Sequence, residues 1–416
     1  MNKHRNTAIM LGCMLLVVLL VVLAGCGSTT TTTGAATTTT AAGTTTTGGA
    51  TTTSGGATTT TAGSSGGSIV IGFDVGLTGK YAAPESPLVN GVKMAVDEIN
   101  AAGGINGKKI DLVIEDTGSE QTGAINAYNR VVAKKPIAIM NTTLSAFVLA
   151  QMDLIKESAI PTLTGASNST LTEKGNPWLF RIRTSDAVIA KAAAQYAIDG
   201  FGTGKKIGFI YSNDEYGKGW KAVVEATMQA AGVTLVAEEA TGVDDKDVSP
   251  QLLKMKAAGA EVVISGDQPT VQAIIMKQAK QLGMTFQLIV SPAGVLPTTL
   301  KLMTADESNG VYGVQSSIPT LDARSKDWAA RYQAKYNLTA DSSAGEYYDG
   351  LMMIADAIKG GATTPKAVAD YLLTIKGKQG MGNTWTFAPN GDGGRQALIV
   401  KIDNGALTPV KTIVVQ

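Results

Sequence analysis

The sequence IVIGFDVGLTGKYAAPESPLVNGVKMAVDEINAAGG, residues 69–104, contains the pattern of one strand, one turn and one helix. Residues 69–73 form a short apolar run of the kind that becomes a buried strand. Apolar residues then recur at helical spacing, at Val92, Ala95, Val96 and Ile99. The pair Gly103-Gly104 ends this pattern, as glycines commonly end helices. The segment therefore predicts a β-strand followed by an amphipathic α-helix.

The same alternation of apolar runs and amphipathic stretches continues through the rest of the chain, and it predicts an α/β fold. The first series of expected strands covers residues 69–73, 110–114, 137–140 and 162–163. The second series covers residues 207–211, 235–237, 262–265 and 288–290, with helices expected at 217–231 and 271–282. Two such series predict two doubly wound lobes with parallel sheets.

The composition excludes several kinds of chemistry. With 35 Lys+Arg against 34 Asp+Glu, the chain has no excess of cations for binding nucleic acid. His4 is its single histidine, and Cys13 and Cys26 are its only cysteines. A Ser-His-Asp site and a His- or Cys-ligated metal therefore cannot form in the α/β region. No Rossmann glycine fingerprint or P-loop is present either, so we expect no cofactor, no metal site and no catalytic site.

The N-terminal segment has the pattern of an export signal. Lys3 and Arg5 precede an almost wholly apolar stretch from Ala8 to Leu23. A transmembrane anchor is the alternative, but the apolar run is shorter than the roughly 20 residues that cross a bilayer. The sequence Leu-Ala-Gly-Cys at 23–26 resembles the lipobox of bacterial lipoproteins. We therefore expect residues 1–25 to be a cleaved signal peptide and Cys26 to carry the lipid.

Residues 27–68 contain only Thr, Gly, Ala and Ser. Such a stretch has no charge and no side chain able to build a core, so residues 26–68 are expected to be the lipidated Cys and a disordered tether. A tether of this length would let a globular part move above a membrane.

Two hydroxyl-rich loops follow neighbouring strands of the first predicted lobe: NTTLS at 141–145 and TGASN at 164–168. In doubly wound sheets, ligands bind at the carboxyl ends of the strands, and between two lobes this place becomes a cleft. Helix N-termini favour a carboxylate, and hydroxyl groups add further donors. The two loops together predict an anion pocket, although helix N-capping by Ser and Thr is an alternative role for each.

Residues 72–107, GFDVGLTGKYAAPESPLVNGVKMAVDEINAAGGING, resemble the opening of the leucine/isoleucine/valine-binding family, the solute receptors of ABC importers. Three further segments continue the resemblance in family order: SAIPTLTGASNSTLTEKGNPWLFRI (158–182), YSNDEYGKGW (211–220) and IMKQAKQLG (275–283). The resemblance implies a type I periplasmic-binding fold, in which three hinge crossings join two lobes. The implied crossings lie near Asp186, near 315–318 and near Asp392. Lobe 1 would then comprise 69–187 plus 317–392, and lobe 2 would comprise 188–316 plus 393–416.

The resemblance also implies a set of ligand-binding residues. Family members hold the ligand's carboxylate with a Ser in the first loop and a Thr in the second, and the matching residues here are Ser145 and Ser167. Backbone groups of Gly165 and Ala166 are expected to join them. Tyr216, in the YG segment, is expected to form the far wall of the cleft, or else to pack beneath the loop.

The expected partner of a ligand's ammonium group is missing. Many amino-acid-binding members use an acidic residue before a Gly in the second lobe, whereas Ala293 stands at that place here. Asp267, at the end of a strand, either supplies the missing negative charge or caps the helix that begins near Thr270. If Asp267 is only a cap, the ligand is a carboxylate or amide without an α-ammonium group. Glu346 is the next acid to test as a cation partner.

These features together imply a lipid-anchored extracytoplasmic receptor at a bacterial membrane. It would bind an amino acid or a related small carboxylate or amide and deliver it to the permease subunits of an ABC importer. A ligand-sensing receptor of the same fold, not coupled to transport, is the alternative. A hydrolase would need two converging acids, for which Asp186 and Asp267 are the only candidates.

Overall fold

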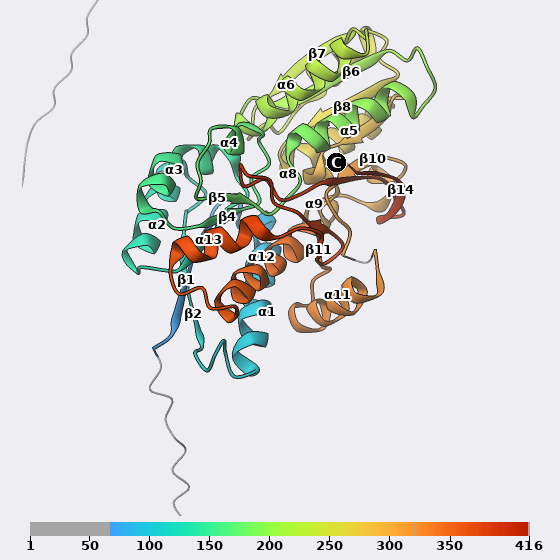
Figure 1. Cartoon of the computed structure of the whole chain (residues 1–416). Helices are drawn as coiled ribbons and strands as arrows, with labels where there is room; N and C mark the ends of the chain where they lie inside the picture. The colour runs from blue at the N-terminus through green and yellow to red at the C-terminus, as the bar shows by residue number, and fades with distance from the viewer. Residues whose placement is uncertain (1–66, 320, 415–416) are drawn as a thin grey trace, which may run out of the picture. The chain divides into compact units, whose positions relative to one another are not determined.

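Strand β1 (Ile69–Val75) belongs to the first of two large sheets in the computed structural model, which describes residues 67–319 and 321–414 (Figure 1). The strand order of this sheet is β2-β1-β3-β4-β5, and every pairing is parallel. Its other strands are β2 (Ile110–Asp116), β3 (Ala138–Asn141), β4 (Thr162–Thr164) and β5 (Leu179–Arg181).

The second large sheet has the strand order β14-β13-β10-β9-β8-β6-β7. Its parallel strands are β6 (Ile207–Ser212), β7 (Ala237–Thr241), β8 (Val262–Gly266), β9 (Gln287–Val290) and β10 (Tyr312–Gln315). Strands β13 (Gln396–Asp403) and β14 (Ala406–Val414) are antiparallel additions at one edge, which the sequence pattern did not predict. The predicted α/β class, with two mainly parallel sheets, is confirmed.

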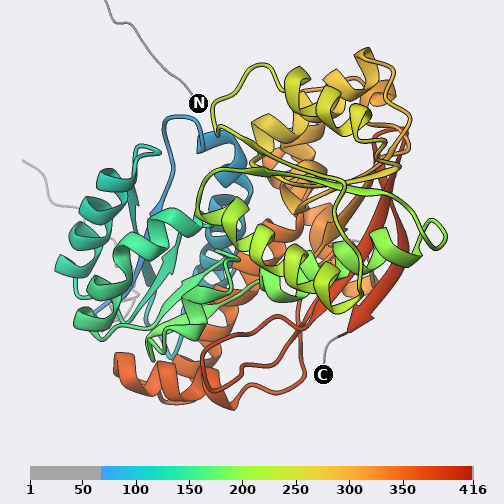
Figure 2. The same ribbon diagram turned by 90° about the horizontal axis from the view of Figure 1, so that it is seen from above.

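Helices cover both faces of each large sheet, as Figure 2 shows. The helices around the first sheet are α1 (Ala82–Ala101), α2 (Gln121–Ala133), α3 (Ser145–Ser158), α4 (Thr170–Glu173), α11 (Ala323–Tyr336), α12 (Ser342–Lys359) and α13 (Pro365–Thr374). Those of the second sheet are α5 (Asp186–Asp199), α6 (Glu215–Ala230), α7 (Ser249–Ala257), α8 (Pro269–Gln281), α9 (Pro297–Leu300), α10 (Ala305–Ser308) and the 3₁₀ turn Pro292–Val295. A short ribbon pairs β11 (Lys378–Gln379) with β12 (Thr384–Trp385).

Helix α1 follows its predicted pattern. Val92, Ala95 and Val96 are buried in the core of the first sheet, while Lys93 and Asp97 are exposed on the opposite face. The chain leaves the helix through Gly103 and Gly104, whose φ angles of 102° and 86° suit only glycine. The amphipathic helix and its glycine stop are therefore as the sequence predicted.

One strand of the second sheet differs from its predicted position. The apolar run at 235–237 was expected to be the strand, whereas β7 begins at Ala237 and continues through two glutamates. β7 is an edge strand, so half of its side chains can remain in solvent. Glu238 and Glu239 form ion pairs with Lys221 and Lys254 of neighbouring helices, which accommodates acidic residues in a strand.

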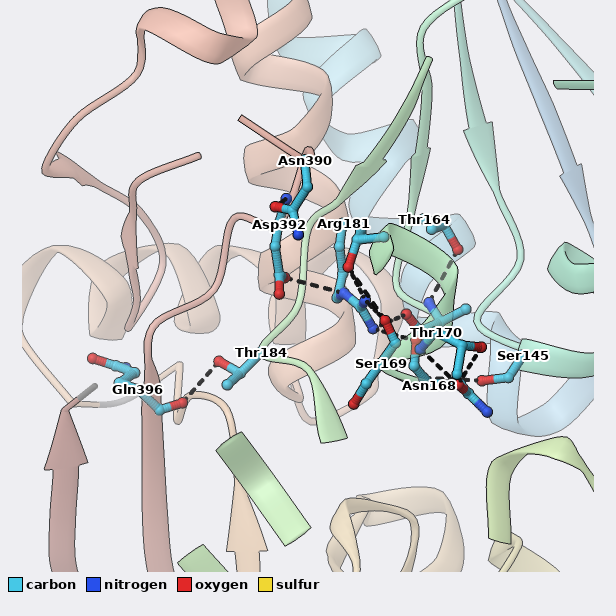
Figure 3. Close-up of polar contacts among 12 residues, drawn as sticks. Ser145, Thr164, Asn168, Ser169, Thr170, Arg181, Thr184, Asn390, Asp392 and Gln396 are labelled. Carbon is cyan, nitrogen blue, oxygen red and sulfur yellow. Dashed lines mark hydrogen bonds and ion pairs between the residues drawn. The ribbon is translucent and has the colours of Figure 1, made fainter. Parts of the chain in front are cut away.

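The chain passes between the two large sheets after β5, after β10 and before β13. Hydrogen bonds join these three crossings. The Thr184 hydroxyl donates to the backbone oxygen of Gln396 over 2.7 Å, a contact drawn in Figure 3. The Gln396 amide in turn donates to the backbone oxygen of Ser316 over 3.1 Å. The crossings therefore lie side by side, where a hinge of three segments requires them.

The predictions for the signal peptide, Cys26 and the tether up to residue 66 lie outside the described residues. Among the helices that the structure does describe, none has the length and apolar character needed to cross a bilayer.

Candidate ligand-binding site

A cavity of about 50 Å³ lies where loops from the carboxyl ends of both large sheets meet. Its wall consists of Tyr81, Pro84, Glu85, Thr143, Leu144, Ser145, Ser167, Arg183, Tyr216, Gln268, Pro269, Ala293, Leu296 and Ser343. These residues follow β1, β3, β4 and β5 of the first sheet and β6, β8 and β9 of the second, with Ser343 from the start of α12. This is the place that parallel α/β sheets use for ligands.

Three hollows of about 680, 620 and 570 Å³ are much larger, but none of them combines the carboxyl ends of both sheets. The largest lies beside the beginning of β1, the second lies against α5 and α6, and the third lies between α9 and the 339–342 segment. The small cavity is therefore identified as the candidate site by its position at the carboxyl ends of both sheets, and not by its volume.

Contacts between the two halves surround this cavity. The Lys80 ammonium lies 3.1 Å from both carboxylate oxygens of Asp244. The Asn168 side chain donates to the backbone oxygen of Glu215 over 2.6 Å. Each bond joins a loop that follows a strand of the first sheet to a segment that follows a strand of the second. The structure therefore holds the two halves together around the candidate site.

Glu85 organises the first loop, and no sequence pattern predicted this role. Its buried carboxylate accepts from the Thr142 hydroxyl (2.5 Å), the Thr143 N–H (2.9 Å), the Thr143 hydroxyl (3.0 Å) and the Gly76 N–H (2.6 Å). Burial raises the pKa of Glu85, while these hydrogen bonds oppose the rise. Glu85 thus fixes the chain just before Ser145.

Ser145 begins helix α3 and lies in the cavity wall. Its hydroxyl oxygen accepts from the backbone N–H of Asn168 over 3.3 Å, which joins the two predicted loops (Figure 3). The N-cap residues of α3 and α4, Leu144 and Ser169, make no side-chain capping bond. The structure therefore shows no Ser or Thr hydroxyl that caps the beginning of α3 or of α4, which was the alternative role of the two loops.

Ser167 also lies in the cavity wall and is 4% exposed. Its hydroxyl lies beside the carboxylate of Asp186 and lowers the pKa of that group, which burial raises overall to about 6. Its backbone oxygen accepts from the Asp186 N–H over 2.7 Å. The second loop is thus tied to the beginning of helix α5, at the first crossing.

Gly165 and Ala166 do not line the cavity. The Gly165 N–H donates to the Tyr347 hydroxyl over 2.9 Å, and the Ala166 N–H donates to the Thr164 hydroxyl over 3.0 Å. Both backbone donors are therefore engaged within the protein. Their predicted contact with a ligand stays a prediction that would require these bonds to be exchanged.

The Arg181 side chain binds the backbone of the second loop, residues 164–168. Its guanidinium is fully buried and donates to the backbone oxygens of Ala166 (3.2 Å) and Asn168 (2.9 Å) and to the Thr172 hydroxyl (2.7 Å). Its Nε lies 3.1 Å from Asp392 Oδ1, at the third crossing (Figure 3). Arg181 therefore links the loop that carries Ser167 to the hinge.

Tyr216 contributes to the wall from the second half. It is 9% exposed, and its ring lies 6.2 Å from that of Trp220. Ser291 lies close enough to affect the ionisation of the Tyr216 hydroxyl, but no hydrogen bond of normal geometry satisfies that hydroxyl within the described residues. A buried hydroxyl without a partner is a donor available to a ligand.

Asp267 is fully buried and is absent from the cavity wall, whereas Ala293 lies in it. The Asp267 carboxylate accepts from the hydroxyls of Thr241 and Ser265. Burial raises the pKa of Asp267 to about 7. No side chain caps helix α8, so the alternative role of Asp267 as its cap is wrong. Its contact with a ligand's ammonium group stays a prediction.

Six wall residues with polar side chains were not among the predicted site residues: Tyr81, Glu85, Thr143, Arg183, Gln268 and Ser343. Arg183 lies two residues after the end of β5, in the crossing that the resemblance had located near Asp186. A charged residue in a predicted hinge at a strand's carboxyl end was the signal that could have identified it. Glu85 and Tyr81 had no such signal, because their position depends on how α1 begins.

The hydroxyls of Ser145 and Ser167 are predicted to bind the ligand's carboxylate. Removing one donor from a buried charged acceptor costs about 1.5–3 kcal/mol, so Ser145→Ala or Ser167→Ala should weaken binding by roughly ten- to a hundredfold. Equilibrium dialysis with a bound acid measures this. Ser86→Ala is the matched control, because the half-buried Ser86 donates to the Ala83 backbone oxygen of its own helix and does not line the cavity. Unchanged affinity in both cleft variants would refute the predicted role.

Comparisons with known proteins agree with this geometry. Residues 68–406 match the family described as "Periplasmic binding protein". The Leu/Ile/Val-binding protein homolog 3 of Brucella melitensis is 28% identical over 330 residues, which cover 78% of this chain and 88% of that protein. An amino acid binding protein of Pseudomonas aeruginosa is 29% identical over 322 residues, covering 75% and 85% of the two chains.

A solved structure is similar over almost its whole length. It is the branched-chain amino acid transporter substrate binding protein LivJ from Streptococcus pneumoniae, in complex with isoleucine. The two structures align with a TM-score of 0.76 and 25% identity, over 84% of this chain and 99% of that one.

Proposed function

Because the chain belongs to the periplasmic binding protein family, whose members are binding proteins and not enzymes, we propose that it is a solute-binding receptor of an ABC importer. Its ligand is an amino acid or a related small carboxylate or amide, held in the cleft between the two lobes. The relatives that are named for binding leucine, isoleucine and valine support this class of ligand.

One observation supports the proposal most strongly: the wall of the cavity combines Ser145, Ser167 and Arg183 from the first half with Tyr216 and Ala293 from the second. Only a closed arrangement presents both sets of groups to one small molecule. A ligand that binds the closed form preferentially shifts the population toward it. In this proposal lobe 1 (69–187 plus 317–392) and lobe 2 (188–316 plus 393–416) close about the three crossings, and the closed form is recognised by the permease.

The first experiment is a thermal-shift screen with amino acids, aromatic acids, amides and short peptides. A ligand at 100 times its Kd stabilises the native state by about 2.7 kcal/mol. That corresponds to a rise in melting temperature of roughly 5–10 °C, at about 2–4 °C per kcal/mol. The absence of any shift at millimolar concentrations over the whole panel would contradict the proposed function.

The receptor is further proposed to be anchored by a lipid on Cys26, on the basis of the Leu-Ala-Gly-Cys sequence. Lipidation requires the thiol, so Cys26→Ser should leave the protein unprocessed or release it from membranes. Labelling with a fatty-acid analogue and membrane fractionation measure this, and Cys13→Ser, within the expected signal peptide, is the control. Lipid labelling that persists in Cys26→Ser would exclude this anchor.

A further inference from the structure

The cavity wall contains one cationic and one acidic side chain among the described residues, Arg183 and Glu85. Their availability to a ligand differs. Arg183 is half-buried, and its Nε is buried without a hydrogen-bond partner. No ion pair joins its guanidinium to an acid within residues 67–319 and 321–414. A guanidinium keeps its positive charge in proteins and offers five donors.

Three acids lie near Arg183 without pairing with it: Asp186, Asp341 and Glu346. Arg183 lowers the pKa of each, but burial outweighs this effect and raises these pKa values to about 6, 6 and 8. None of the three lines the cavity. Arg183 is thus a cation near three acids that lie outside the cavity wall, and none of these carboxylates forms an ion pair with it.

Glu85, in contrast, is already engaged by the protein on both oxygens. Oε1 accepts three hydrogen bonds, from the Thr142 hydroxyl and from the N–H and hydroxyl of Thr143. Oε2 accepts one, from the Gly76 N–H. Asp267 does not reach the cavity wall, and Ala293 offers no charge. An ammonium group in this cavity would therefore find in the wall only a carboxylate that already holds the first loop, and burying a poorly paired charge is unfavourable.

We infer that Arg183 forms the ion pair with the ligand's carboxylate, and that the site selects a singly charged carboxylate without an α-ammonium group over the corresponding amino acid. The inference rests on the proposed function and narrows its ligand class. The remainder of the wall fits an uncharged and partly apolar ligand body, since it includes Pro84, Leu144, Pro269 and Leu296. Arg183 is therefore a specificity-determining residue.

The test uses two pairs of probes that differ only in the α-ammonium group: 4-methylpentanoate against leucine, and 3-phenylpropanoate against phenylalanine. Equilibrium dialysis is performed on the full-length chain in detergent. We expect the acid of at least one pair to bind about tenfold or more tightly than its amino acid, because only the amino acid buries a poorly paired charge. Tighter binding of the amino acid in both pairs would overturn the inference.

Variants test the residue itself. Arg183→Gln should raise the Kd of the bound acid by about 30-fold or more, because truncating one partner of a buried charged pair leaves the other unpaired. Arg183→Lys should recover part of the affinity, and Arg130→Gln, at an exposed arginine of α2, should leave it unchanged. The ligand-free melting temperature of Arg183→Gln should stay within a few degrees of that of the wild type, since the guanidinium has no hydrogen bond or ion pair to lose among the described residues and only its attraction to Asp186, Asp341 and Glu346 is removed.

These measurements distinguish a failure of the role of Arg183 from a failure of the receptor function. An unchanged Kd in a folded Arg183→Gln variant overturns the inference but leaves the receptor function standing. Failure of all four probes to bind also overturns the inference. The proposed function fails only if the wider thermal-shift panel gives no ligand either.

Discussion

Arg181→Met is expected to lower the melting temperature by at least about 5 °C. The guanidinium of Arg181 is fully buried, it donates to three backbone oxygens and one hydroxyl, and its Nε lies 3.1 Å from the Asp392 carboxylate. Removing the guanidinium leaves these polar acceptors buried without their donor, at about 1–3 kcal/mol for each, and leaves the partly exposed Asp392 carboxylate without its cation. A kilocalorie per mole corresponds to roughly 2–4 °C in a protein of moderate size. Calorimetric unfolding measures the change.

Two further variants identify the cause of this loss. Asp392→Asn alone should lower the stability less than Arg181→Met does, since the Asp392 side chain is 17% exposed. Combined with Arg181→Met, it should recover part of the stability, because no unpaired carboxylate remains. Arg130→Gln, whose side chain is 50% exposed, should change stability by less than about 1 kcal/mol. A melting temperature of Arg181→Met within 2 °C or so of the wild type would refute Arg181 as the anchor of the second loop.

The second large effect concerns pH. Burial raises the pKa of Glu346 from 4.5 to about 8, with Asp341 and Asp349 adding to the rise and Arg183 and Ser316 opposing it. The folded state therefore holds a proton on Glu346 that the unfolded chain releases above pH 4.5. The stabilising contribution of this carboxyl is complete below pH 4.5, declines as the pH rises, and is lost above about pH 8.

Glu346→Gln should remove this decline. The free energy of unfolding of the variant should gain on that of the wild type by up to about 1.4 kcal/mol per pH unit between pH 5 and 8. Urea unfolding at a series of pH values measures the slope, which does not depend on any constant offset from the substitution. Glu157→Gln, at an exposed position of α3, should run parallel to the wild type. Parallel curves for Glu346→Gln would mean that Glu346 is ionised in the folded protein.

The fold was predictable wherever a buried apolar run preceded an amphipathic helix. β1, β6 and β8 are of this kind, and the structure places them within one or two residues of their predicted ends. β13 and β14 were missed because they form a hairpin with no helix between them. The pair Asn404-Gly405, with φ angles of 51° and 80°, forms the turn and is a recognised hairpin signal that would have identified these strands.

The site was predictable only in part, and for a physical reason. Ser145 and Ser167 follow adjacent strands, so the topology alone brings their loops together. Arg183 and Glu85 reach the same cavity from a hinge and from the start of a helix, which no local pattern specifies. Asp267 was singled out because it ends a strand, yet its carboxylate accepts from Thr241 and Ser265 and does not reach the wall. The order of the strands thus predicts which loops form the site, but it does not predict which side chains of those loops point into the cavity.

Isothermal titration calorimetry of the full-length chain with the acid that gives the largest thermal shift determines whether this cleft is a carboxylate site. We expect saturable binding of one molecule per chain, with a negative heat-capacity change from burial of apolar surface. We also expect the double variant Ser145→Ala/Ser167→Ala to bind at least about a hundredfold more weakly while remaining folded. Binding with wild-type affinity in that variant, or the absence of saturable heat with the wild-type protein, would contradict a carboxylate receptor in this cleft.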